Sequence, residues 1–316
     1  MKLFISRPLP NAVLDRARAG FDATVREKTT PLTHDEMVTS LRDFDIVLPT
    51  LGDLYSADVF SAAGPIRARL LANFGVGYNH IDVDAAKAHG LQVSNTPGAV
   101  TDATADTAMT LILMTARRAG EGERMLRAGN WEGWHPTQLL GQHVSGKTVG
   151  IIGMGRIGEA IAQRCHHGFG MKVVFHNRSP KTPDVPATQL GSIEAVAKAA
   201  DILVIAVPGG TDTHHLIGAK TLAAMPPHAI LINIARGEIV DEAALITALD
   251  TGQISGAGLD VYEFEPKVPA ELIARENVTL LPHLGTATLE VRTDMGMLAM
   301  DNIEAFAKGA PLPTPI

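Results

Sequence analysis

The chain of 316 residues has little cysteine, no long apolar run and no excess of positive charge. Its single cysteine, Cys165, excludes an internal disulfide and a thiolate metal cluster, and we expect it to be a small core residue on a helix. The N-terminal apolar run is too short for a signal peptide, and nothing approaches the roughly 18 apolar residues of a membrane span. The net charge of −7 argues against binding a nucleic-acid backbone through bulk charge. These absences favour a cytoplasmic protein and leave room for a small anion bound at one local site.

Two domains are the default expectation at this length. Residues 1 to about 98 alternate helix-forming stretches with short apolar runs at 3–5, 45–48, 70–74 and 92–94, as in a small α/β domain. A long, mostly apolar helix is predicted from Thr101 to Arg118 and is interpreted as a bridge to a second domain.

A larger series of strand and helix signals runs from Lys147 to His283. The last helix, predicted over 289–308, is followed by no further predicted strand and is expected to pack on the first domain. We therefore predict an α/β protein with two doubly wound parallel sheets and a cleft between its domains. The predicted domains are residues 1–98 plus 286–316, and residues 99–285.

A dinucleotide-binding motif follows the predicted strand 148–152. Gly153, Gly155 and Gly158 have the G-x-G-x-x-G spacing, and a helix-like stretch comes next. The first glycine permits a tight turn, the second lets backbone approach a pyrophosphate, and the third allows close helix packing. The string alone is a weak signal, but its place between a strand and a helix favours a dinucleotide site.

The end of the next predicted strand, 172–175, bears on the choice of cofactor. NAD sites place an acidic residue about 20 residues beyond the glycines, whereas this chain has Asn177, Arg178 and Ser179 there, with Lys181 just beyond. Arg178 can pair with a 2′-phosphate, and its neighbours can donate hydrogen bonds. NADP(H) is therefore the predicted cofactor. The alternative is an ordinary basic surface loop, with NAD(H) accepted.

Three polar residues, Arg236, Glu265 and His283, each follow an apolar run, at 229–234, 256–261 and 278–281. Parallel strands place their carboxyl ends at one sheet edge, where ligands bind. A guanidinium can clamp a carboxylate, an imidazole can transfer a proton, and a carboxylate can orient and charge that imidazole. The pattern predicts acid/base chemistry on a small anion, although Glu263 leaves open which of two carboxylates points inward.

The strings Gly153–Gly158, Asn233–Glu238, Gly258–Pro266 and Leu281–Ala287 closely resemble the D-2-hydroxyacid dehydrogenase family, and the resemblance covers nearly the whole chain. It is nearest to the glyoxylate/hydroxypyruvate reductase branch, through Asn73–Tyr78 and the Trp131–Trp134 segment. The resemblance implies a flavodoxin-like substrate domain, a Rossmann domain, and reversible hydride transfer between NAD(P)H and a 2-keto acid. It also selects Glu265, immediately before Pro266, to act with Arg236 and His283.

The resemblance further implies that backbone N–H groups around Val76 and Gly77 receive the substrate carboxylate, although a plain glycine turn would need the same glycines. Asp260 resembles the family aspartate beside the nicotinamide carboxamide; a strand-end cap is the alternative. The Gly209-Gly210 pair departs from a more usual Leu-Thr and leaves the pyrophosphate contacts of its loop uncertain. The cofactor residues implied are Gly153, Gly155, Arg156, Ile157, Gly158, Asn177, Arg178, Ser179, Val207, Pro208, Thr213, Ile234, Ala235, Arg236, Asp260, His283 and Gly285.

Other functions stay open. The substrate could instead be an aromatic or branched 2-keto acid, such as hydroxyphenylpyruvate, and similar proteins include a nucleotide-sensing corepressor. The tryptophan segment is expected at a homodimer interface, with a core role as the alternative. The adjacent histidines 166–167 and 214–215 are expected to point in different directions, and His-Glu-x-x-His or Cys-x-x-Cys spacing is absent, so no metal site is predicted.

Overall fold

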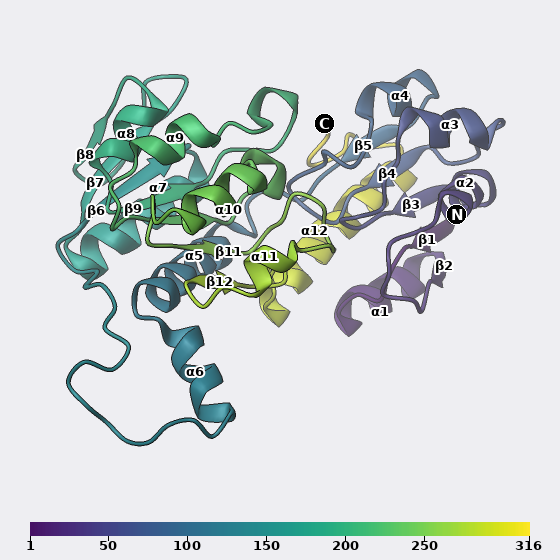
Figure 1. Cartoon of the computed structure of the whole chain (residues 1–316). Helices are drawn as coiled ribbons and strands as arrows, with labels where there is room; N and C mark the ends of the chain where they lie inside the picture. Colours follow the sequence, from purple (N-terminus) through teal and green to yellow (C-terminus); the bar gives the residue numbers. More distant parts are fainter. The chain divides into compact units, whose positions relative to one another are not determined.

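The computed structural model describes residues 1–316, which divide into two compact units (Figure 1). Unit 1 contains Met1–Val100 and Thr286–Ile316, and unit 2 contains Thr101–Gly285. Each unit is built on one fully parallel sheet, so the prediction of two doubly wound α/β domains is confirmed. No helix has both the length and the apolar character needed to cross a membrane.

Unit 1 has a five-stranded sheet in the order β2-β1-β3-β4-β5, which is the flavodoxin-like order. The C-terminal helix α12 packs on α1 and β4, and a Cβ at Gly296 would lie 2.4 Å from the Val13 side chain. The elements are β1 (Lys2–Ile5), α1 (Asn11–Gly20), β2 (Asp22–Val25), α2 (His34–Asp43), β3 (Ile46–Leu48), α3 (Ala57–Ala63), β4 (Leu70–Ala72), α4 (Val83–Ala88), β5 (Gln92–Ser94) and α12 (Leu289–Ala307).

Unit 2 has a seven-stranded sheet in the order β12-β11-β10-β9-β6-β7-β8, a Rossmann order with one added strand. The helix α5 packs against β10, β11 and β12. The elements are α5 (Thr101–Ala116), α6 (Ala119–Arg127), β6 (Thr148–Ile152), α7 (Arg156–Gln163), a π-helical turn (Arg164–Gly168), β7 (Lys172–His176), β8 (Ala187–Gln189), α8 (Ile193–Ala199), β9 (Ile202–Ile205), α9 (Ala219–Ala224), β10 (Ile230–Asn233), α10 (Glu242–Asp250), β11 (Gly256–Leu259), α11 (Ala270–Ile273) and β12 (Val278–Leu280).

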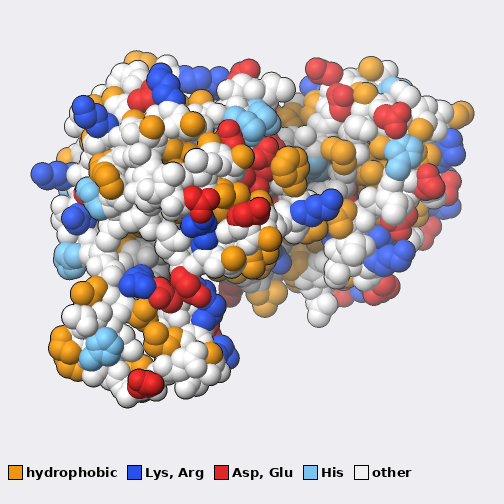
Figure 2. Space-filling model, viewed as in Figure 1, with side chains coloured by type: hydrophobic (Ala, Val, Ile, Leu, Met, Phe, Trp, Pro, Cys, Tyr) orange, Lys and Arg blue, Asp and Glu red, His pale blue; other side chains and the backbone are white.

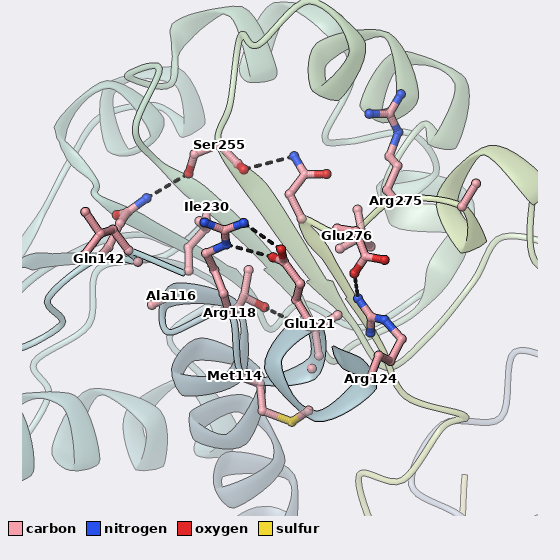
Figure 3. A pocket seen from close by; sticks show the side chains of 18 residues that line it. Met114, Ala116, Arg118, Glu121, Arg124, Gln142, Ile230, Ser255, Arg275 and Glu276 are labelled. Atoms are coloured by element: carbon pink, nitrogen blue, oxygen red, sulfur yellow. Dashed lines mark hydrogen bonds and ion pairs between the residues drawn. The ribbon is translucent and has the colours of Figure 1, made fainter. Parts of the chain in front are cut away.

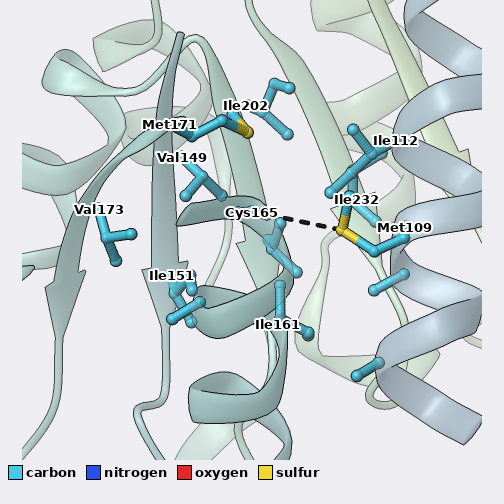
Figure 4. Close-up of a cluster of buried hydrophobic side chains, with 14 of the residues drawn as sticks. Met109, Ile112, Val149, Ile151, Ile161, Cys165, Met171, Val173, Ile202 and Ile232 are labelled. Carbon is cyan, nitrogen blue, oxygen red and sulfur yellow. Dashed lines mark hydrogen bonds between the residues drawn. The ribbon is translucent and has the colours of Figure 1, made fainter. Parts of the chain in front are cut away.

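Hydrophobic cores lie on both faces of the unit 2 sheet, because helices cover the central strands on each side. Figure 4 shows Val149 and Ile151 of β6 on one of these faces, together with Cys165. The Cys165 thiol lies 3.6 Å from the Met109 sulfur, and burial raises its pKa to about 12. Cys165 is therefore an unreactive core residue, as the sequence indicates.

Three strands, β2, β8 and β9, lie outside the predicted ones, and one helix ends early. Both β2 and β8 are short edge strands whose residues are exposed or only half-buried, so neither contains an apolar run. The helix predicted to reach Arg118 ends at Ala116, because Arg118 adopts a left-handed backbone (φ 51°) that redirects the chain into α6.

Candidate active site

The three predicted polar residues all follow neighbouring strands of the unit 2 sheet. β10, β11 and β12 are adjacent and parallel, so the segments that follow them leave from one edge. Arg236 follows β10, Glu265 follows β11 and His283 follows β12. Strand order therefore gathers residues that are up to 47 positions apart in the sequence, 236 to 283.

His283 and Glu265 form a direct hydrogen bond. The His283 Nδ1 atom lies 2.9 Å from Glu265 Oε2, and the backbone N–H of Tyr262 donates to the other carboxylate oxygen at 3.1 Å. Burial acts to raise the pKa of Glu265, but the His283 bond, the Tyr262 N–H and the charge of Arg236 together lower it below its ordinary value. Glu265 is therefore held as a carboxylate that can orient and stabilise a charged imidazole. Glu263 contacts His215 instead, at 2.8 Å.

The backbone at His283 is itself unusual. It adopts a left-handed conformation (φ 54°), and its N–H donates to the Asp260 carbonyl. The Asp260 carboxylate accepts from the N–H groups of Leu284 at 2.6 Å and Gly285 at 2.8 Å. Burial raises the Asp260 pKa, against the effect of these bonds and of His283. Asp260, which is 1% exposed, thus fixes the turn that carries the histidine.

Arg236 is positioned by its own turn and by a close backbone approach. The Asn233 amide donates to the Arg236 carbonyl at 2.9 Å, and its oxygen accepts from the Ala235 N–H at 3.1 Å. A Cβ at Gly237 would lie 1.8 Å from the Tyr262 carbonyl carbon, so only glycine lets this turn reach the segment that carries Glu265. Burial lowers the pKa of Arg236, which the charges of Glu265 and Glu238 oppose.

The glycine-rich turn between β6 and α7 fits a dinucleotide. Gly153 has φ 99°, and a Cβ at Gly158 would lie 2.1 Å from the Gly153 carbonyl oxygen, which explains the first and third glycines. A Cβ at Gly155 would meet nothing within 4 Å, so the backbone there is open to a ligand. The helix beyond begins at Arg156, and its first N–H groups have no acceptor within the helix. The arrangement leaves room for a pyrophosphate.

The residues expected at a 2′-phosphate differ in their freedom to bind it. Asn177 is already engaged: its oxygen accepts from the Met154 N–H at 3.2 Å, and its amide donates to Ser179. It therefore supports the glycine-rich turn, and its expected donation to a phosphate would require these bonds to break. Arg178 is 91% exposed, with Asp212 at 3.9 Å as its ion-pair partner.

The segment after β9 is organised around Arg236. The Thr213 hydroxyl donates to the carbonyls of Pro208 and Gly210, at 2.8 and 3.1 Å, so its hydrogen is used within the segment. A Cβ at Gly209 would lie 2.7 Å from the Arg236 Cγ atom. The departure from the family pattern at Gly209 therefore leaves room for the arginine stem. Val207, Ile234 and Ala235 flank this region and are buried or half-buried.

The adjacent histidines do not all point apart as expected. The rings of His214 and His215 are stacked, with centroids 4.0 Å apart and an interplanar angle of 26°, because His215 has a left-handed backbone (φ 51°) and is bonded to Glu263. The side chains of His214, His215 and Glu263 bring possible ligand atoms within 4.8 Å of one another. However, the lone pairs of stacked imidazoles lie in nearly parallel planes and cannot both reach one ion at about 2.0–2.1 Å.

Unit 1 holds the other predicted substrate residues, Val76 and Gly77. They follow β4 at the carboxyl edge of the unit 1 sheet and are half-buried. Their N–H groups have no acceptor in the chain. Two side chains that the sequence did not single out, Asn73 and Asn95, bond to the carbonyls of this turn.

A cavity lies at the opposite, amino edge of the unit 2 sheet (Figure 3). Its volume is about 580 Å³, and the starts of β10, β11 and β12 contribute to its wall. Its charges are paired: Arg118 makes two bonds to Glu121, at 2.8 and 2.7 Å, and Arg124 contacts Glu276. The cavity is thus polar but electrostatically satisfied, and it lies away from the candidate catalytic residues.

Comparisons with known proteins agree with this geometry. Residues 109–285 match the family model of the D-isomer specific 2-hydroxyacid dehydrogenase, NAD binding domain. The chain is 42% identical to the glyoxylate reductase of Thermococcus gammatolerans, over 99% of this chain and 95% of that protein. A crystal structure of a Thermus thermophilus protein has a TM-score of 0.92 at 39% identity, covering all of both chains.

A crystal structure of the NADPH-dependent glyoxylate/hydroxypyruvate reductase from Sinorhizobium meliloti, in complex with NADP and malonate, has a TM-score of 0.87 at 37% identity. It covers 100% of this chain and 96% of that one. The match to the family model lies within unit 2, and the matches to full-length relatives extend over both units. This chain therefore belongs to the D-2-hydroxyacid dehydrogenase family, in the branch of the glyoxylate reductases.

Proposed function

We propose that this protein reduces a small 2-keto acid, glyoxylate or hydroxypyruvate, to the D-2-hydroxy acid. The observation that carries the proposal is the 2.9 Å bond between His283 and Glu265, with Arg236 close enough to lower the pKa of that carboxylate. An acid, its charge partner and an anion-binding cation thus lie at one sheet edge. A protein that only senses nucleotides has no need of this trio.

His283 is the proton donor in this proposal. Its Nδ1 is bonded to Glu265, which leaves Nε2 to protonate the oxygen of the reduced carbonyl. The carboxylate of Glu265 stabilises the imidazolium that must be present before this transfer. The hydride would come from a reduced nicotinamide dinucleotide whose pyrophosphate the glycine-rich turn would hold.

Arg236 is proposed to bind the substrate carboxylate and polarise its keto oxygen, because a guanidinium offers two parallel donors. The N–H groups of Val76 and Gly77 in unit 1 are also proposed to bind a substrate carboxylate. Both are unpaired backbone donors at the carboxyl edge of a parallel sheet, where ligands of such sheets bind.

We further propose that NADPH is preferred over NADH, with Arg178 pairing with the 2′-phosphate. Arg178 is exposed, so its long side chain can turn toward a ligand, and no acidic side chain stands at the position that would accept a ribose 2′-hydroxyl. The nearby Asp212 carboxylate would compete with the 2′-phosphate for the Arg178 guanidinium.

The direct test is a panel of 2-keto acids assayed with NADPH and with NADH. Glyoxylate and hydroxypyruvate should give the highest kcat/KM, and NADPH should be favoured. Preferential turnover of hydroxyphenylpyruvate or a branched keto acid would replace the substrate assignment but keep the chemistry. No reduction of any keto acid with either cofactor would refute the enzymatic function.

A homodimer is also proposed. The helix α6 and the loop after it extend away from the rest of unit 2 (Figure 1), and hydrophobic side chains lie on this extension (Figure 2, lower left). Trp131 is 52% exposed and Trp134 is 79% exposed, which is unusual for indole side chains outside an interface. Light scattering of the wild type should give twice the chain mass, and Trp131→Ser with Trp134→Ser should give a monomer.

A cytoplasmic location is proposed as well, since the one thiol is buried and forms no disulfide.

A further inference from the structure

The turn that follows β4 in unit 1 is held by two side-chain amides. The Asn73 amide donates to the carbonyls of Gly75, at 3.1 Å, and Gly77, at 3.0 Å. The Asn95 amide, which follows β5, donates to the carbonyl between them, that of Val76, at 2.8 Å. Two side chains therefore hold three successive carbonyls, and the Gly75 carbonyl also accepts from the Thr96 backbone N–H at 3.0 Å.

Fixing these carbonyls also fixes the N–H groups. In a trans peptide the N–H of one residue points opposite to the carbonyl of the residue before it. The bond from Asn73 to the Gly75 carbonyl therefore orients the N–H of Val76. The bond from Asn95 to the Val76 carbonyl orients the N–H of Gly77 in the same way. The Asn95 amide thus orients the Gly77 N–H, whereas the Asn73 amide shares the orientation of the Val76 N–H with the backbone of Thr96.

The orientation of the Asn73 amide is determined by His80. Asn73 is fully buried, and its oxygen lies 3.0 Å from His80 Nε2. An amide oxygen can only accept, so Nε2 must donate, and the Asn73 amide group is left facing the carbonyls of the turn. His80 is also buried, so this chain of hydrogen bonds is shielded from water.

Asn95 is anchored independently of its side chain. Its backbone N–H donates to the Thr314 carbonyl at 3.2 Å, and its carbonyl accepts from the Thr314 hydroxyl at 2.6 Å. Removing the side-chain amide should therefore release the Val76 carbonyl and leave the rest of the segment in place.

We propose that Asn73 and Asn95 are positioning residues that aim the Val76 and Gly77 N–H groups at the carboxylate of the substrate. This inference rests on the proposed function, in which those N–H groups receive a 2-keto acid. The amides hold neutral dipoles in a set direction, so the anion gains oriented donors without any added positive charge.

The test uses the full-length enzyme with Asn95→Ala, and Asn277→Ala as the matched control. Asn277 donates to the Ser255 carbonyl at 3.0 Å, the same kind of bond at the amino edge of the unit 2 sheet. Asn95→Ala should raise KM for the keto acid by roughly tenfold, the lower end for a charge-assisted hydrogen bond, with kcat at saturation and KM for NADPH changed less than about twofold. The control should match wild type in all three constants. Equal KM values for Asn95→Ala and wild type would overturn the inference.

A second variant and a second readout separate this inference from the proposed function. Asn73→Asp keeps the acceptor for His80 but faces the carbonyls of the turn with a carboxylate, so its KM should rise further, on the order of a hundredfold. Independently of turnover, oxamate added with saturating NADPH should shift the ¹⁵N–¹H signals of Val76 and Gly77 in wild type. In Asn95→Ala the Gly77 shift should be lost. A wild type that reduces no keto acid refutes the function alone, whereas an oxamate shift at Gly77 that persists in Asn95→Ala refutes the positioning role.

Discussion

The seven-stranded sheet of unit 2 carries one histidine–carboxylate pair where its strands begin, the amino edge, and another where its strands end, the carboxyl edge. At the amino edge, His228 Nε2 lies 2.6 Å from Asp201. At the carboxyl edge, His283 Nδ1 lies 2.9 Å from Glu265. In both pairs burial acts to raise the carboxyl pKa, yet hydrogen bonds and nearby charges bring it below its ordinary value. The pair geometry and the carboxylate electrostatics are thus shared.

The surroundings of the two pairs differ. Asp201 also accepts from the Thr148 N–H at 2.8 Å, so the amino-edge pair joins the start of β6 to the segments before β9 and β10. The carboxyl-edge pair instead has Arg236 beside it and the glycine-rich turn at the same edge. A histidine bonded to a carboxylate is therefore common structural chemistry, and its neighbours decide whether it performs a reaction.

The largest expected difference between the edges is in turnover. His283→Ala should lower kcat by about 10²–10⁴, the usual worth of a general acid, while NADPH affinity stays near wild type. His228→Ala should leave kcat within about twofold. Steady-state kinetics and NADPH titration of both variants measure this. Comparable losses of kcat in the two variants would contradict the role of His283 as the general acid.

Arg236→Lys keeps the charge but removes the planar pair of donors. It should raise KM for the keto acid at least tenfold and also lower kcat, because the clamp both holds the carboxylate and sets the carbonyl in place. The control is Arg164→Lys, since Arg164 bonds to Asp106 at 2.7 Å and Asp102 at 3.0 Å within unit 2. Normal kinetics for Arg236→Lys would mean that another cation binds the substrate.

Arg178→Ala tests the cofactor end of the same edge. KM for NADPH should rise about 10- to 150-fold with kcat retained, and KM for NADH should barely change. Arg178→Asp should go further, by repelling the phosphate. Asp212→Asn should act in the opposite direction and tighten NADPH, because it frees the arginine from its 3.9 Å partner. Equal weakening of NADPH and NADH binding would mean that Arg178 does not pair with the 2′-phosphate.

Glu265→Gln should move the pH dependence without abolishing activity. The proposed reduction requires a protonated His283, and a neutral amide stabilises the imidazolium less than a carboxylate does. The alkaline limb of the kcat/KM profile should therefore shift toward acid. Asp201→Asn, the equivalent change at the amino edge, should leave the profile where it is. An unmoved profile in Glu265→Gln would exclude the proposed role.

The smallest expected effect concerns stability at the amino edge. The folded-state pKa of Asp201 is depressed, so its carboxylate stabilises the fold above the unfolded value of about 3.9, and this stability is lost as pH falls through the folded value. Asp201→Asn should cost about 1 kcal/mol in urea unfolding at pH 7. The difference in the free energy of unfolding between this variant and wild type should shrink as the pH is lowered below 4. A difference that does not change with pH would mean that the charge of Asp201 does not stabilise the fold.

The sequence predicts the parts of the site that strand order alone determines. Arg236, Glu265 and His283 follow apolar runs, so their shared edge can be inferred from the pattern of the amino acids. Asn73 and Asn95 escape notice because each acts on carbonyls whose positions depend on the folded turn. The stacking of His214 on His215 was equally hidden, since it depends on a left-handed backbone at a residue that seldom adopts one.

The backbone conformation of His283 has a consequence for protein engineering. A side chain with a Cβ at φ 54° costs about 1–2 kcal/mol that glycine avoids and asparagine partly recovers. Screens that rank variants by thermal stability would therefore favour His283→Gly and His283→Asn, the changes that remove the proposed proton donor. At this position a gain in stability is expected to report a loss of function, as in other sites where strain and activity are linked.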